Sequence, residues 1–102
     1  MAGVGTLLKQ AQKMQKQMES LQSELEKREL DLTSGGGAIA IKVNGGGKFL
    51  AIKFDPEFLK EDPKLIEEAL LLAVQEAAAK AKELNESEMK KVTSAFQMPG
   101  FM

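Results

Sequence analysis

The sequence predicts a single-domain α+β fold with the order α-β-β-β-α, in which two long helices flank a three-stranded antiparallel sheet. Apolar residues recur every three to four positions near both ends of the chain and alternate with polar residues between them. Two triple-glycine runs, at 35–37 and 45–47, interrupt the alternating region and mark turns between strands. The 102 residues suffice for one modest core.

The first helix is expected at about 6–27. A narrow apolar seam follows it with alternating steps of four and three residues, the heptad spacing of a helix that packs along one line against another helix. The seam consists of Leu7, Ala11, Met14, Met18, Leu21 and Leu25. Lys9, Lys13 and Lys16 fall on the opposite side of this helix and are expected to face solvent.

Three strands are expected at about 29–33, 38–44 and 48–54, because apolar residues there alternate with polar ones. The apolar face of the sheet carries Leu30, Leu32, Ile39, Ile41, Val43, Leu50, Ile52 and Phe54. The alternation leaves Phe49 and Ala51 on the other face, together with Ala40. An aromatic residue there indicates that this second face is partly covered as well.

The second long helix is expected at about 63–97. Asp55-Pro56 and Asp62-Pro63 each combine an N-cap carboxylate with proline at the first helical position, and the first pair predicts only a short turn. The helix after the second pair is apolar over a wide arc, so we expect it to be the better buried one. Asn85 is a candidate interruption, and Pro99-Gly100 ends the helix before a short C-terminal tail.

The two glycine runs are interpreted as turns and not as nucleotide sites. Asn44-Gly45 between alternating strands is a strong hairpin signal, in which both turn residues are expected to have positive φ. A phosphate-binding P-loop needs Ser or Thr after its lysine and a helix behind it, whereas Phe49 and a strand follow Lys48.

The composition argues against an enzyme. The chain contains no histidine and no cysteine, which removes the usual bases and thiol nucleophiles, and we expect no cofactor, no metal site and no small-molecule substrate. The absence of cysteine fits a reducing cytoplasm, and no apolar stretch is long enough to span a membrane.

Charge is distributed unevenly along the chain. The net charge is −1, but residues 1–53 carry eight basic and five acidic side chains, whereas residues 54–102 carry six basic and ten acidic ones. The first 18 residues contain three lysines, Lys9, Lys13 and Lys16, and no acid. Such a stripe is either the soluble exterior of a coiled coil or a surface that follows DNA phosphates. Because Arg28 is the only arginine, duplex binding would be electrostatic and weakly sequence-selective.

Four stretches support a more specific interpretation: LLKQAQKMQKQM, VNGGGKFLAIKFDPEFL, EALLLAVQEAAAKA and QMPGFM, in this order along nearly the whole chain. Together they resemble the YbaB/EbfC family of bacterial nucleoid-associated DNA-binding proteins. The resemblance implies a homodimer joined largely through its sheets, with projecting helical arms that bind double-stranded DNA, and a place in the cytoplasm at the nucleoid. It maps the N-terminal arm to residues 7–25, where the lysines lie.

The predicted DNA-binding residues are Lys9, Lys13, Lys16, Gln10, Gln12, Gln17, Lys90 and Lys91, and those of the dimer interface are Phe49, Ala51 and Ala40. An alternative of another class remains open at this point. Two heptad helices beside hairpins also describe a coiled-coil interaction module or a prefoldin-like chaperone, and Met14 and Met18 suit adaptable apolar contacts.

Overall fold

The structure is a computed structural model that describes residues 2–95, with side chains from residue 3. Its elements are α1 (Ala2–Lys27), β1 (Glu29–Ser34), β2 (Ile39–Asn44), β3 (Phe49–Phe54), the short 3-10 helix η1 (Phe58–Lys60) and α2 (Pro63–Ala95). The predicted α+β class and its α-β-β-β-α order are confirmed. Helix α1 begins four residues earlier than expected, and the predicted end of the second helix at 97 lies outside the described residues, as do Pro99 and Gly100.

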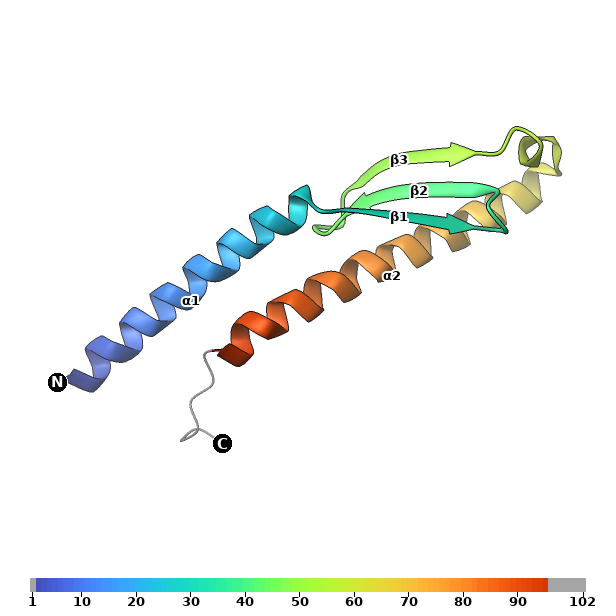
Figure 1. The fold of residues 1–102 in the computed structure, drawn as a ribbon. Helices are drawn as coiled ribbons and strands as arrows, with labels where there is room; N and C mark the ends of the chain where they lie inside the picture. The colour runs from blue at the N-terminus through green and yellow to red at the C-terminus, as the bar shows by residue number, and fades with distance from the viewer. Residues whose placement is uncertain (1, 96–102) are drawn as a thin grey trace.

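The sheet is antiparallel, in the order β1-β2-β3. Helix α2 runs beneath β1 and β2, while β3 lies farther from it (Figure 1). The buried core therefore joins the central strand to one side of the helix: Ile39, Ile41 and Val43 pack against Ala73, Ala77 and Ala81. Alanines spaced four apart form a smooth stripe on α2, which lets the helix approach the branched side chains of β2 closely.

The molecule is elongated. Its extents are 70 × 25 × 16 Å and its radius of gyration is 19.9 Å, against about 13 Å for a compact domain of this length. Figure 1 shows the reason: α1 and the last part of α2 leave the sheet together as an antiparallel pair, and the N-terminal end of α1 reaches farthest. This pair is the projecting arm of the fold. Neither helix, over the residues described, is long and apolar enough to cross a membrane.

The β2–β3 connection differs from the predicted Asn-Gly turn. No residue other than glycine has positive φ in the described chain, and in this turn only Gly47 does, at 91°. Asn44 belongs to β2 instead, where its side-chain oxygen accepts hydrogen bonds from the backbone N–H groups of Gly46 and Lys48, at 3.0 and 2.9 Å. The three glycines thus form the turn, and the asparagine side chain braces it.

The predicted face of Phe49 is wrong. A register shift between Lys42 and Val43 pairs Phe49 with Val43, although Ala51 pairs with Lys42 as plain alternation requires. Cross-strand partners share a face, so this bulge moves Phe49 to the α2 side of the sheet. An extra residue in one strand changes the alternation beyond it, which a period-two pattern does not reveal.

Helix α2 is the better buried of the two long helices, as expected, with Ala73, Ala77 and Ala81 in the core. Its apolar arc is not fully buried, because Leu65, Leu71 and Leu72 remain 47%, 60% and 54% exposed. Asn85 does not interrupt the helix, which is continuous from Pro63 to Ala95. At the other end, Phe58 of η1 stacks on Phe54 of β3 with ring centroids 6.5 Å apart, which ties the β3–α2 connection to the sheet.

Candidate nucleic-acid interface

The lysine stripe occupies the outer side of the projecting arm. Lys9, Lys13 and Lys16 are all exposed, and no ion pair to any of them occurs within residues 2–95. They follow α1 at spacings of four and three residues, so the stripe is about 10 Å long, or about three base-pair steps of duplex DNA. Three uncompensated cations at this spacing can contact successive phosphates.

The opposite side of α1 holds the arm in place. Along the seam, Leu25 is buried and Met14, Met18 and Leu21 are half-buried, whereas Leu7 near the free end is exposed. The C-terminal half of α2 therefore covers α1 from its middle to the end nearest the sheet. This packing turns the lysines away from α2, as the heptad pattern predicted.

The predicted glutamines divide between two environments. Gln12 and Gln17 are exposed, whereas Gln10 is half-buried. Gln15, which was not among the predicted contacts, donates to the Glu19 carboxylate at 3.5 Å. Gln12 and Gln17 are thus the two predicted glutamines that are freely accessible beside the lysines.

Lys90 and Lys91 lie on the last turns of α2, alongside the middle of α1. Met89, next to them, lines one shallow hollow together with Gln15 and Met18. Both lysines are exposed, but the Nζ of Lys91 lies 3.2 Å from the Glu88 carboxylate. Lys90 has no ion pair among residues 2–95, which makes it the less compensated of the two cations.

Glu88 of α2 connects the C-terminal turns of α2 to the end of α1. Its carboxylate accepts hydrogen bonds from Lys91 at 3.2 Å and from Arg28 at 3.4 Å, and Arg28 lies where α1 leads into β1. The hydrogen bond from Lys91, followed by that from Arg28, lowers the pKa of Glu88 below its ordinary value of 4.5. The sequence pattern did not reveal this link, because its partners lie 60 residues apart.

The sheet face opposite α2 is mixed in character. Ala40 and Ala51 are half-buried there, and pairing places Ala40 beside Lys53 and Ala51 beside Lys42. Asp31 pairs with Lys42 on the same face, and Lys42 also approaches the Glu29 carboxylate at 3.9 Å. Two of the three predicted dimer-interface residues therefore lie among charges, and Phe49 lies on the other side.

A larger apolar surface was missed by the sequence prediction. Leu50 and Ile52 of β3 are each 42% exposed and Phe49 is 38% exposed, because α2 runs beneath β1 and β2 and leaves β3 uncovered. Ala78 lines a hollow with the β2–β3 turn, and the exposed Leu71 lies on the same face of α2, two turns earlier. The wide apolar arc of α2 was the available signal for this surface.

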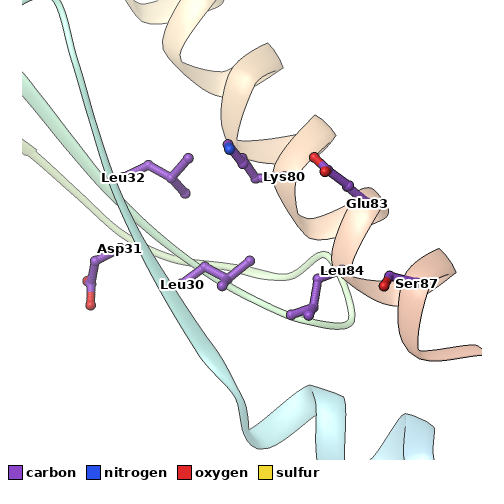
Figure 2. A pocket seen from close by; sticks show the side chains of 7 residues that line it. All are labelled: Leu30, Asp31, Leu32, Lys80, Glu83, Leu84 and Ser87. Atoms are coloured by element: carbon purple, nitrogen blue, oxygen red, sulfur yellow. The ribbon is translucent and has the colours of Figure 1, made fainter. Parts of the chain in front are cut away.

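On the other flank of α2, an open groove of about 440 Å³ separates the helix from β1. Figure 2 shows Leu30 and Leu32 pointing from β1 toward α2, while Asp31 points away, as strand alternation requires. The polar side chains of α2 at this groove are Lys80, Glu83 and Ser87. They are spread along the rim and do not converge on one point.

Comparison with known proteins agrees with this architecture. The model of the YbaB/EbfC DNA-binding family matches residues 1–96. A protein of Clostridium kluyveri named nucleoid-associated protein is 45% identical over 98 residues, covering 95% of this chain and 86% of that protein, and a nucleoid-associated protein of Clostridium novyi is 40% identical over the same share of both.

Among solved structures, an uncharacterized protein from Helicobacter pylori shares the fold with a TM-score of 0.75. It is 20% identical, and the match covers 91% of this chain and 96% of that one. The resemblance found in the sequence is thus confirmed over nearly the full length. The chain belongs to the YbaB/EbfC DNA-binding family.

Proposed function

We propose that this chain is a nucleoid-associated protein whose homodimer binds double-stranded DNA with weak sequence selectivity through the lysines of its projecting arms. The observation that carries the proposal is the acid-free lysine stripe on the outer side of α1. Family membership and the names of the relatives support the DNA partner and a location at the nucleoid.

The side chains on the arm support contact with phosphates more than with bases. Lysine is a flexible point charge that binds phosphates without the planar fork by which arginine recognises guanine. Arg28, the only arginine, lies at the base of the arm and is engaged with Glu88. Gln12 and Gln17 can add hydrogen bonds to phosphates or base edges beside the lysines.

The uncovered apolar surface supports the homodimer. Phe49, Leu50 and Ile52 on β3 and Leu71 on α2 form a surface that the chain's own helix leaves open. Complete burial of one such side chain contributes about 1.5–3 kcal/mol. Because these residues are still half-exposed, burial against a second copy of the chain would gain a substantial part of that free energy. Of the predicted interface residues, Phe49 belongs to this surface. Ala40 and Ala51 lie on the opposite face, where a dimer contact would desolvate Lys42 and Lys53.

Duplex binding across a salt series, measured by fluorescence anisotropy on two unrelated sequences, tests the proposal. Six lysine contacts in a dimer predict a slope of log K against log salt near −5, at about −0.9 per phosphate. Both duplexes are expected to bind with similar affinity. Lys9→Glu combined with Lys13→Glu should weaken binding by at least about a hundredfold at low salt, because each removed contact and added repulsion costs more than about 1 kcal/mol.

The matched control is Lys64→Glu combined with Lys80→Glu, which changes the net charge equally but on α2 beside the sheet. An equal loss of binding in both double variants would indicate that overall charge, and not the stripe, determines affinity. Absence of duplex binding by the unchanged chain at low salt would refute the proposal itself.

A chaperone-like module is the second candidate, and one observation favours it. At the free end of α1, Val4, Leu7 and Leu8 are all more than half exposed. An exposed apolar tip of this kind can bind apolar segments of another protein. Suppression of the aggregation of a thermally unfolded client protein, lost in Leu7→Ser with Leu8→Ser and retained in the lysine double variant, would support this candidate.

A further inference from the structure

The base of the arm holds a set of polar contacts that no part of the DNA-contact proposal uses. Gln22 of α1 and Asn85 of α2 form a reciprocal amide pair: Gln22 Nε2 donates to Asn85 Oδ1 at 3.4 Å, and Asn85 Nδ2 donates to Gln22 Oε1 at 3.2 Å. Asn85 Nδ2 also donates to the Gly45 carbonyl at 3.1 Å. One side chain therefore joins both arm helices to the β2–β3 turn.

The same turn closes the C-terminal end of α1. The last carbonyls of a helix have no partner inside the helix. Here the Gly45 N–H donates to the Leu25 carbonyl and to the Arg28 carbonyl, each at 2.9 Å, and Asn44 Nδ2 donates to the Glu26 carbonyl at 3.0 Å. Asn44 and Gly45 are both buried. The hairpin is thus hydrogen-bonded to the end of the arm and does not merely reverse the chain.

These contacts are directional, as is the ion pair between Arg28 and Glu88, whereas the apolar packing along the rest of the arm is not. Beyond Leu25, toward the free end of α1, the side chains of the apolar seam are at most half-buried. Apolar seams of this kind slide and tilt at little cost, and a single polar pair within them is a known means of fixing register.

We propose that the Gln22–Asn85 pair, together with the Asn44-Gly45 turn, is a positioning joint that sets the direction of α1 and thereby places the lysine stripe on DNA. The inference rests on the proposed DNA-binding function, and none of the four residues needs to touch DNA. From Leu25 to Lys9 the arm is about 24 Å long, so a tilt of about 15° at its base displaces Lys9 by about 6 Å, nearly two base-pair steps.

The test replaces the amide pair by apolar side chains of similar size, Gln22→Met with Asn85→Leu. The matched control is Gln15→Met, which makes the same chemical change at an exposed position of α1 that does not contact Asn85. Arm direction is measured by electron-spin distance measurements between nitroxide labels at Gln12→Cys and Thr33→Cys, two exposed positions, in labelled chain diluted with an excess of unlabelled chain. The absence of native cysteine makes the labelling selective.

The expected result of the distance measurement is a broadened or shifted distribution. In the unlabelled variant, duplex binding should weaken about tenfold at one salt concentration, because two arms that are not held in place engage one duplex with lower effective concentration. The melting temperature should fall by no more than several degrees, because both members of the amide pair are replaced together and only the Gly45 carbonyl loses a partner. The control should keep both the native distribution and the native affinity.

Two results would overturn the inference: an unchanged distance distribution, or a changed one with native DNA affinity. Should the double variant unfold, Gln22→Met alone provides the same readouts, because it keeps the bond from Asn85 to Gly45. Failure of the proposed function would look different, since the unchanged chain itself would then not bind the duplex, whatever the labels report about the arm.

Discussion

Replacement of Gly45 by alanine tests whether the β2–β3 turn supports the arm. A Cβ at this position would lie 2.7 Å from the carbonyl oxygen of Leu25 and 3.1 Å from its Cβ. The first distance is shorter than real Cβ contacts allow, and the obstacle is backbone that cannot rotate away. The turn must therefore retreat from the end of α1, and the N–H of Gly45 loses its bonds to Leu25 and Arg28.

The expected cost combines two terms. Overpacking of a closely fitted site costs about 1–3 kcal/mol, and each neutral hydrogen bond lost contributes about 0.5–1.5 kcal/mol. We expect Gly45→Ala to lower the free energy of unfolding by about 2–6 kcal/mol, the sum of the overpacking and the two lost hydrogen bonds, measured by urea denaturation followed by circular dichroism. Because a dimer's stability depends on concentration, all chains are compared at one concentration.

Gly5→Ala is the matched control. Nothing lies within 4 Å of a Cβ placed at Gly5, which is inside α1, so the same substitution there should raise the free energy of unfolding by up to about 1 kcal/mol through helix propensity. Equal stability of Gly45→Ala and the unchanged chain would refute the close contact between the turn and the arm, and with it the positioning joint.

Two further predictions concern the dimer and pH. Ile52→Asp should convert the proposed homodimer to monomer in sedimentation experiments, because it places a charge in the uncovered apolar surface. Ala51→Asp on the opposite face should leave the proposed dimer intact, and the reverse outcome would favour the sheet face first predicted. Glu88 has a lowered pKa, so its ionised form is favoured in the folded chain and its stabilising contribution is present above pH 4.5 and lost as the pH falls below that value. The melting temperature of Glu88→Gln should accordingly lie below that of the unchanged chain at pH 7, and this difference should disappear in strong acid.

The local elements of the fold could be predicted from the sequence, because each has a period that its own residues set. The heptad seam from Leu7 to Leu25 identified α1 and the side on which its lysines lie, and alternation identified the face of Ile39, Ile41 and Val43. Where one extra residue entered the pattern, at the bulge near Phe49, the prediction of the face failed, since a period identifies neighbours only while it is unbroken.

The candidate DNA contacts could also be predicted from the sequence, but the tertiary contacts that hold them in place could not. The lysine stripe follows from i, i+4 and i+7 spacing within one helix. The links of Gln22 to Asn85 and of Arg28 to Glu88 join residues 63 and 60 positions apart, and nothing in the local sequence around any of the four indicates its partner. In the sequence, Asn85 therefore suggested an interruption of α2. In the structure, it joins the continuous α2 to α1.

By itself, the sequence determined which segments are helical or extended, which side of each is apolar, and that the three lysines within the first 18 residues have no acid among them. Only the tertiary structure decided which apolar sides meet. The stripe of Ala73, Ala77 and Ala81 beneath β2 excludes Leu71 from the core, and the position of α2 under two of three strands leaves Ile52 open. The reason is physical: local periodicity specifies faces, whereas the choice of partner for each face depends on the packing of the whole chain.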